Sequence, residues 1–139
     1  MTAENNGAKA LGTHIILDLY GCSPELLKDV DILKGILREA AVKAQATVMH
    51  MAGYKVGGPA EKHPAAKNTP DGVSVYIGLD ESHISCHTYA DLGMASIDVF
   101  TCGHVAKPRI AVGYILSEIR HKKNVVKYID RFVMEINDG

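Results

Sequence analysis

Residues 72–102 read GVSVYIGLDESHISCHTYADLGMASIDVFTC and carry the pattern of three consecutive strands. Between residues 73 and 79 apolar side chains alternate with small or polar ones, which is typical of a strand with one buried face. Residues 82–89 and 94–102 predict two more strands, and the ADLG between them predicts a turn with Gly93 at positive φ. Because parallel strands need long crossovers, these short links indicate an antiparallel sheet.

Elements on either side of this stretch can face the same sheet. Residues 13–22, THIILDLYGC, predict a strand that places Ile15, Leu17 and Leu19 on one face. A single helix is expected to follow, with Ser23 as its N-cap and Pro24 at its first position. Its apolar positions recur at spacings of three and four, which predicts one stripe packed on the sheet. They include Leu26, Val30, Leu33, Leu37 and Ala44.

The remaining segments complete an α+β order. Residues 46–53 predict a strand, residues 54–72 a long Gly- and Pro-rich loop, and residues 125–136 a last strand after a helix that starts at Pro108. Residues 1–12 have little to bury and are expected to form a loose arm. Two helices cover one face of such a sheet, so we expect a two-layer α/β sandwich whose other face is covered by a partner subunit.

Composition limits the class of partner. The chain has 139 residues, enough for one domain, and a formal net charge of −1, which gives no electrostatic footprint for nucleic acid or an anionic membrane. A small molecule or another protein is the expected partner. The N-terminus lacks a signal-peptide pattern and no apolar run approaches a membrane span, so we expect a cytoplasmic protein with three free cysteines.

Reactive side chains crowd the stretch, and three chemistries could use them. A metal site is the first, built from nitrogen and sulfur ligands: His83, Cys86, His87, Cys102 and His104. Strand alternation sends the neighbours Cys86 and His87 to opposite faces, so we predict no metal site. The second is a Cys/His nucleophile, with Cys102 just before Gly103 at a strand end.

The third chemistry starts at Glu81-Ser82. A serine hydroxyl can attack the preceding peptide carbonyl and form an ester, and loss of the α-proton then breaks the chain and leaves a ketone at the new N-terminus. That ketone would act as an electron sink for decarboxylation. Spacing alone does not select this third chemistry over the others.

Longer motifs carry a specific resemblance. The ESHISCHT segment followed by DVFTCG resembles the processing and active-site motif of the prokaryotic S-adenosylmethionine decarboxylases, pyruvoyl-dependent enzymes of polyamine (spermidine) synthesis. The segments GTHIILDLYGC, ATV and GVS are similar to that family as well. The likeness extends over residues 11–136. It implies a dimer whose two sandwiches stack as four layers, αββα, with residues of both subunits lining each site.

The resemblance also implies roles for individual residues. Self-cleavage between Glu81 and Ser82 would divide the single domain, residues 1–139, into a β chain of residues 1–81 and an α chain of residues 82–139. Ser82 would become the covalent pyruvoyl group, which forms a Schiff base with the substrate amine. His87 would take the α-proton during processing, Ser74 would assist it, and Cys102 would protonate the product carbanion. No metal or soluble cofactor is implied.

One detail is in tension with ideal strand geometry, and another departs from the family pattern. His87 lies five residues beyond Ser82, on the opposite side of an ideal strand, so a twist or bulge near Ser82 is expected to bring them together. Tyr89-Ala90-Asp91 stands where the family has an aromatic residue, proline and glutamate. We therefore expect Tyr89 and Asp91 to bind the substrate, with Asp91 on the ribose hydroxyls.

Two alternative functions stay open at this point. Relatives of the fold decarboxylate arginine or ornithine, and such an enzyme needs acids to hold the distal cation. The candidates are Asp71, Asp80, Asp91 and Asp98. The other alternative is a regulatory relative that never cleaves.

Overall fold

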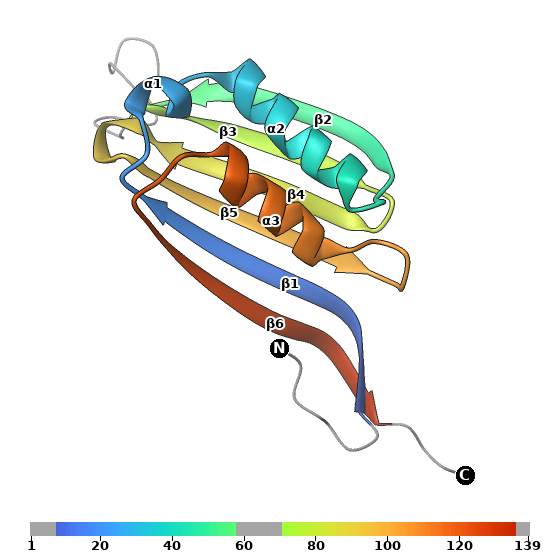
Figure 1. Cartoon of the computed structure of the whole chain (residues 1–139). Helices are drawn as coiled ribbons and strands as arrows, with labels where there is room; N and C mark the ends of the chain where they lie inside the picture. Colours follow the sequence, from blue (N-terminus) through green and yellow to red (C-terminus); the bar gives the residue numbers. More distant parts are fainter. Residues whose placement is uncertain (1–7, 58–70, 136–139) are drawn as a thin grey trace.

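The computed structural model describes residues 8–57 and 71–135 as a six-stranded antiparallel sheet with helices on one face (Figure 1). The strand order is β2-β3-β4-β5-β1-β6. The strands are β1 (Ala8–Tyr20), β2 (Val48–Val56), β3 (Gly72–Leu79), β4 (Ser82–Tyr89), β5 (Met94–Cys102) and β6 (Lys123–Glu135). The helices are α1 (Pro24–Leu27), α2 (Val30–Lys43) and α3 (Pro108–Glu118), and a 3-10 turn, η2 (Ala90–Leu92), joins β4 to β5. The predicted α+β class with one helical layer is confirmed.

The core lies between the helices and one face of the sheet. Alternate residues of β1 and β3 are buried there, as their patterns predict: Ile15, Leu17, Leu19, Val73, Val75 and Ile77. The helices contribute Leu33, Leu37, Val112 and Ile115 from their apolar stripes. Gly93 has φ 66° at the end of η2, as predicted for this turn.

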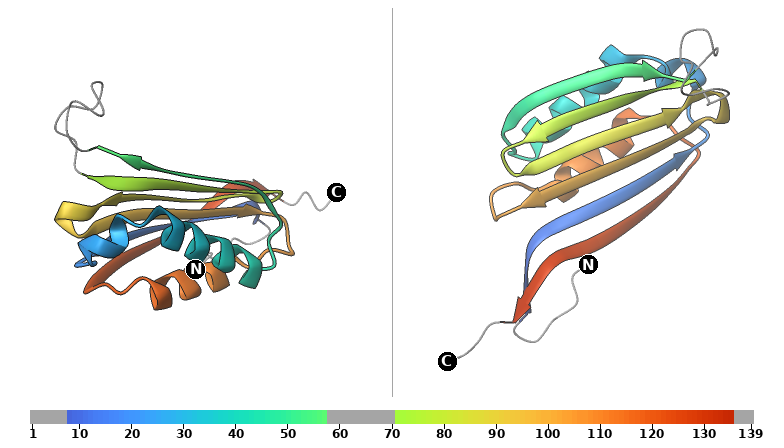
Figure 2. Two further views of the ribbon diagram at one scale, coloured as in Figure 1. Left: turned by 90° about the horizontal axis from the view of Figure 1, so that it is seen from above. Right: turned by 180° about the vertical axis from the view of Figure 1, so that it is seen from behind.

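The opposite face of the sheet carries no helix in the described part of the chain and is called the open face below (Figure 2). Residues of β3, β4 and β5 that alternate with the core residues point to it. Ser74, His87, Asp98 and Cys102 are among them, by the register that pairs Ser74 with His87 and Ser85 with Asp98. The reactive polar side chains of the chain therefore lie away from the helices.

The helix expected after Ser23 is in fact two helices. Ser23 holds the N-cap position of α1 but makes no side-chain capping bond, and α1 ends at Leu27 after one turn. Asp29 accepts a hydrogen bond from the Ile32 N–H and starts α2 as a separate helix. An aspartate can cap a helix because its oxygen replaces the carbonyl that the first amides lack, and this cap divides the stripe in two.

Both ends of β1 and β2 also differ from the prediction. Residues 8–12, expected in a loose arm, form the start of β1 because they pair with the end of β6. β2 continues to Val56, so three residues assigned to the long loop are strand. Residues 1–7, 58–70 and 136–139 lie outside the described residues, and with them the predicted end of the last strand at residue 136.

The last strand follows its predicted alternation as far as Asp130. Tyr128 points to the helix side, where the Arg109 guanidinium lies 4.2 Å from its ring centre. Phe132 has φ 55°, a backbone conformation that bulky side chains rarely adopt. Beyond the pairing of β1 with β5, the segments 8–11 and 132–135 form a two-stranded arm at the end of the sheet (Figure 1).

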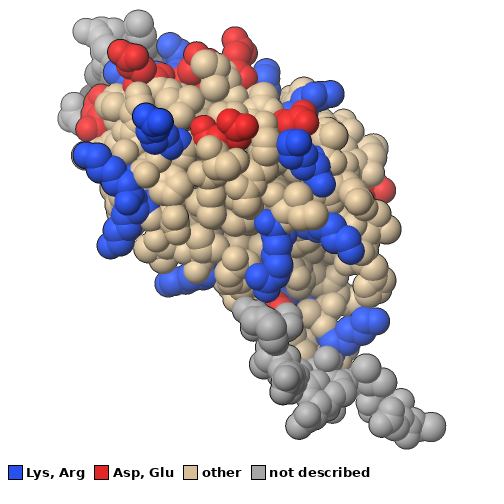
Figure 3. Space-filling model, viewed as in Figure 1, with Lys and Arg blue, Asp and Glu red and all other residues tan. Residues whose placement is uncertain are grey.

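Charge on the helical face agrees with the near-neutral composition. Basic and acidic side chains are interspersed over α2 and α3 in the view of Figure 3. Among the described residues, no helix combines the length and the apolar character that crossing a membrane requires.

Candidate active site

The β3–β4 turn places the predicted cleavage position beside the predicted acid. Ser82 begins β4, and its Oγ lies 3.7 Å from the Cys102 Sγ at the end of β5. Ser82 has φ 144°, outside the conformations that a serine normally adopts. The structure therefore brings together two of the predicted residues, and it holds one of them in a strained backbone.

The peptide bond before Ser82 is also engaged. The Cys102 N–H donates to the Glu81 carbonyl oxygen at 2.9 Å. This is the carbonyl that the Ser82 hydroxyl would attack, and a backbone N–H aimed at it stabilises negative charge that develops on its oxygen. Cys102 thus contacts the Glu81-Ser82 unit through both its thiol and its amide.

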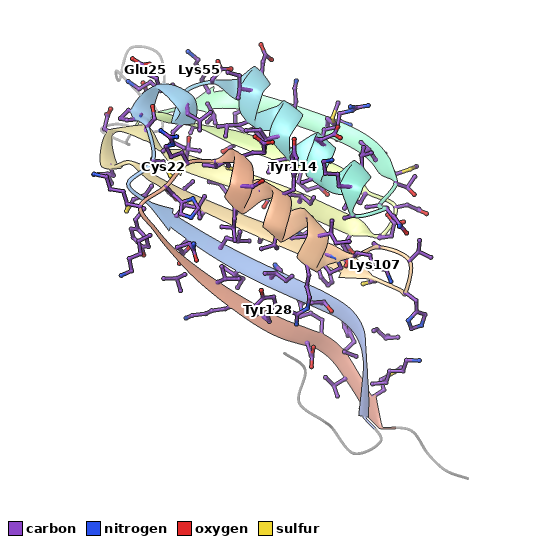
Figure 4. The ribbon with its side chains drawn as sticks, in the orientation of Figure 1. Cys22, Glu25, Lys55, Lys107, Tyr114 and Tyr128 are labelled. Carbon is purple, nitrogen blue, oxygen red and sulfur yellow. The ribbon has the colours of Figure 1, made fainter. Side chains whose placement is uncertain are left out.

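Only one of the three thiols is placed to react. Cys22 lies where β1 leads into α1 (Figure 4), and burial raises its pKa. Burial raises the pKa of Cys86 to about 12, with smaller contributions from the charges of Cys22 and Asp98. Cys102 is half-buried and borders a pocket of about 550 Å³. The pocket has a mainly apolar lining that includes Leu11, Phe132 and Met134, with Lys9 and His104 among its polar members.

Ser74 and His87 form a second group on the open face. The His87 Nδ1 and the Ser74 Oγ are hydrogen bonded at 2.8 Å across the β3–β4 pair. Ser74 is buried, whereas the His87 ring is exposed. An exposed imidazole fixed by a buried hydroxyl is oriented toward whatever covers the open face.

The two groups are not in contact with each other. β4 runs without a bulge against β3 and β5, so the five residues from Ser82 to His87 extend about 17 Å. The prediction that a twist or bulge brings Ser82 and His87 together is therefore wrong within one chain. The strained φ of Ser82 turns its hydroxyl toward Cys102 but does not shorten the strand.

Asp98 holds a third cluster on the same face. The Arg131 guanidinium has donors only, so it donates to the His14 Nδ1 (2.9 Å) and leaves the proton of His14 on Nε2. The His14 Nε2 (3.3 Å) and the His83 Nε2 (2.8 Å) then donate to one oxygen of Asp98, and the Ser85 Oγ (2.9 Å) donates to the other. The ligand atoms of His14, His83 and Asp98 lie within 4.8 Å of one another, but the Arg131 contact keeps the proton of His14 on Nε2, the atom that would have to bind a metal. We interpret this group, called the Asp98 cluster below, as a hydrogen-bond network.

Known proteins are similar in sequence to this chain over most of its length. Residues 13–132 match the family model described as S-adenosylmethionine decarboxylase. The chain belongs to the S-adenosylmethionine decarboxylase family.

Individual members agree over most of the chain. An S-adenosylmethionine decarboxylase proenzyme of Thermodesulfovibrio yellowstonii is 39% identical over 81% of this chain and 75% of its own length. One from Pyrobaculum neutrophilum is 36% identical over 90% of this chain and 92% of its own. The crystal structure of the adenosylmethionine decarboxylase from Aquifex aeolicus superposes with a TM-score of 0.78 at 29% identity, covering 94% of this chain and 98% of that one. The predicted resemblance and fold are both confirmed.

The two predicted substrate residues lie far from Ser82 in this family member. Tyr89 is the last residue of β4, at the opposite end of the strand from Ser82, and Asp91 follows in η2. Lys28 Nζ lies 3.8 Å from an Asp91 oxygen and 3.9 Å from an Asp71 oxygen, in an exposed group. Within one chain, Tyr89 and Asp91 lie nearer to the Ser74–His87 pair than to the Ser82–Cys102 pair.

Three residues around Ser82 and Cys102 did not emerge from the sequence. Gly12 faces Cys102, and a β-carbon there would lie 3.1 Å from the Cys102 Sγ. A glycine inside a strand often marks the close approach of another group, so Gly12 could have been predicted from the sequence as such a position. Thr47 contacts Glu81, and Phe132 lines the pocket at Cys102, but no local pattern distinguishes either residue.

Proposed function

We propose that this chain is a self-cleaving S-adenosylmethionine decarboxylase proenzyme. The observation that carries the proposal is the contact set at Glu81-Ser82, where Cys102 meets the Ser82 hydroxyl through its thiol and the Glu81 carbonyl through its amide. In a member of this family, that arrangement supports both cleavage at this bond and decarboxylation beside it.

Cleavage would begin with attack of the Ser82 Oγ on the Glu81 carbonyl carbon. The Cys102 N–H stabilises the resulting oxyanion, the C–N bond breaks, and the hydroxyl proton passes to the released amine. Removal of the Ser82 α-proton then breaks the Cβ–O bond and frees the Glu81 carboxylate. The remaining enamine exchanges its nitrogen for the oxygen of water and releases ammonia. A chain of residues 1–81 and a chain of residues 82–139 with an N-terminal ketone result.

His87 is proposed as the base that removes the α-proton, but it would act from a second copy of the chain. One chain presents Ser82–Cys102 near one end of its open face and Ser74–His87 about 17 Å along β4. A twofold axis between two open faces would place the Ser74–His87 pair of each copy against Ser82 of the other. A homodimer with two composite sites follows, with the sheets inside and the helices outside.

The same pairing gives Tyr89 and Asp91 a role. Both lie beyond His87 on β4 and η2, so a copy that delivers His87 to its partner's Ser82 brings these residues to the same site. Asp91 would accept hydrogen bonds from the ribose hydroxyls of the substrate, and Tyr89 would line the pocket.

Decarboxylation would use the pocket at Cys102. A pyruvoyl ketone formed from Ser82 would supply the electron sink for the electron pair that remains when the carboxylate leaves as carbon dioxide. The residues present fit that group, because Ser82 already lies between the Glu81 carbonyl and the Cys102 thiol. Cys102 would hold a proton on Sγ for delivery to the product carbon, while Leu11, Phe132 and Met134 exclude water.

Charge in the described residues favours S-adenosylmethionine over arginine or ornithine. Asp98 already accepts hydrogen bonds from His14, His83 and Ser85, and Asp71 and Asp91 share Lys28. A basic amino acid would need an uncompensated carboxylate to hold its distal cation. Asp98 is therefore unavailable to a cation, and Lys28 opposes a second cation at Asp71 and Asp91 while leaving the exposed Asp91 able to accept from neutral hydroxyls.

Carbon dioxide release from the purified protein with S-adenosylmethionine, arginine and ornithine tests the substrate. We expect release from S-adenosylmethionine, with the Cys102→Ala variant cleaved at least in part but deficient in turnover. Release from arginine or ornithine alone would overturn the substrate assignment.

A further inference from the structure

Glu81 precedes the bond proposed to break, and its side chain is held by the residue that leads into β2. The Thr47 N–H donates to the Glu81 Oε1 at 2.8 Å, and the Thr47 Oγ1 donates to the Glu81 Oε2 at 3.3 Å. Both oxygens of the carboxylate are thus engaged by one residue. Hydrogen bonds to a charged acceptor are stronger than neutral ones, so this contact can orient the Glu81 side chain.

Backbone hydrogen bonds also restrain residues 80 and 81. The Asp80 N–H donates to the Thr47 carbonyl at 2.9 Å, and the Cys102 N–H donates to the Glu81 carbonyl at 2.9 Å. Residues 80 and 81 are therefore tied to the start of β2 on one side and to the end of β5 on the other. This leaves the Glu81-Ser82 peptide little freedom to rotate.

The strain at Ser82 requires such a support. A non-glycine residue in a sparsely populated backbone region costs about 1–3 kcal/mol and persists only where its surroundings fix it. From the next residue onward β4 pairs regularly with β3 and β5, which fixes the C-terminal side of Ser82. On the N-terminal side, Thr47 and Cys102 supply the restraint through Glu81.

We propose that Thr47 is a positioning residue for self-cleavage. Acting through the Glu81 carboxylate, it holds the Glu81 carbonyl on the Cys102 amide and Ser82 in its strained conformation, ready for attack. Thr47 touches none of the reacting atoms. The inference rests on the proposed cleavage and adds the device that sets its rate. After cleavage Glu81 is the last residue of the 1–81 chain, and the same contact retains this new terminus.

The rate of self-cleavage tests the role, measured by intact mass at intervals after synthesis of the proenzyme in vitro. Thr47→Val keeps the shape and loses the hydroxyl, and we expect cleavage roughly tenfold slower. Thr47→Ser restores the hydroxyl and should cleave near the wild-type rate. Ser117→Ala, which removes an exposed hydroxyl on α3, is the matched control and should leave the rate unchanged.

A double-mutant cycle shows whether the effect passes through Glu81. Glu81→Met removes both acceptors at similar size and should slow cleavage more than Thr47→Val. The double variant should be no slower than Glu81→Met alone, because the contact is already lost. Additive slowing would overturn the inference, as would a wild-type rate for Thr47→Val.

Two further readouts separate positioning from general stability. Turnover per pyruvoyl-bearing chain should be unchanged in Thr47→Val. The thermal midpoint of unfolding should also be unchanged when chains with Thr47 and with Thr47→Val are compared in the uncleavable Ser82→Ala background. If that midpoint falls, Glu81→Met decides instead, because it leaves Thr47 in place and removes only the acceptors of an exposed contact, so the midpoint should hold and cleavage should still slow. A wild-type chain that never cleaves would overturn the proposed function itself. Cleavage that is equally fast in the wild type and in Thr47→Val would overturn only the role of Thr47.

Discussion

The three cysteines show how position on one sheet separates an inert thiol from a usable one. Cys86 occupies the core face of β4, and burial raises its pKa to about 12, whereas Cys102 lies on the open face of the neighbouring strand beside Ser82. A thiol must lose its proton to act as a nucleophile. Of these two thiols, we therefore expect Cys102 to be the one that transfers a proton to the product and that reacts with an alkylating reagent.

Thiol labelling checks this difference. A raised pKa lowers the thiolate fraction at any pH below it, so at pH 8 iodoacetamide should modify Cys102 and leave Cys22 and Cys86 intact in the folded protein. In urea all three should react. Mass analysis of digested protein locates the label, and modification of Cys86 ahead of Cys102 would contradict the assignment.

Gly12 acts at the same scale, by leaving space. An alanine there would place its β-carbon 3.0 Å from the Phe100 ring and 3.1 Å from the Cys102 Sγ. Displacement of a reacting group by a fraction of an ångström is costly, so Gly12→Ala should lower turnover per cleaved chain about tenfold. Gly113→Ala, on α3 with nothing within 4 Å, is the control and should keep wild-type turnover. Equal turnover in the two variants would remove Gly12 from the account.

At the scale of elements, the packing of β3 on β4 connects the core to the second polar pair. The Thr88 Oγ1 accepts from the Val73 N–H and donates to the Leu27 carbonyl, so α1, β3 and β4 meet at one buried hydroxyl. Ser74 and His87 are the adjacent residues on the open face. The orientation of His87 thus depends on a junction on the other side of the sheet.

Gly72 is the tightest point of this junction. A β-carbon on Gly72 would meet the Thr88 carbonyl oxygen, and backbone cannot move aside as a side chain can. Gly72→Ala should therefore lower the free energy of unfolding by about 3 kcal/mol, measured by urea titration of the Ser82→Ala proenzyme. Gly35→Ala, on the exposed face of α2, should raise it by up to about 1 kcal/mol. A loss at Gly72 no larger than a few tenths would refute the close contact.

Strand periodicity predicted the strands and their buried faces well. It did not predict how far apart Ser82 and His87 lie within one chain. Alternation assigned the core faces of β1 and β3 correctly, because side chains in a strand have a strict period of two. The Asp29 cap that starts α2 as a separate helix and the pairing of residues 8–12 with β6 depend on hydrogen bonds that periodicity does not report. The family motif named Ser82, His87 and Cys102, but the separation of His87 from the Ser82–Cys102 pair became visible only in three dimensions.

At the scale of the whole molecule, the Ser82–Cys102 and Ser74–His87 pairs of one chain lie too far apart to meet, and the proposed site would form only between two copies. Chains with His87→Ala keep Ser82 and lack the base, whereas chains with Ser82→Ala keep the base and cannot cleave. Neither variant should cleave alone. When the two are produced together with different affinity tags, the His87→Ala chain should be cleaved, because its Ser82 meets His87 of the other copy. Failure of cleavage in the isolated mixed dimer would contradict a shared site.

The mass of the purified chain tests the central claim, that the protein converts its own Ser82 into a catalytic group. We predict two fragments, residues 1–81 and 82–139, with masses that sum to the full-length mass plus one water minus one ammonia, while Ser82→Ala stays whole. A single species at the full-length mass would contradict the account and support a non-cleaving regulatory protein. Fragments that retain the ammonia would equally contradict it, since they would show hydrolysis without formation of the ketone.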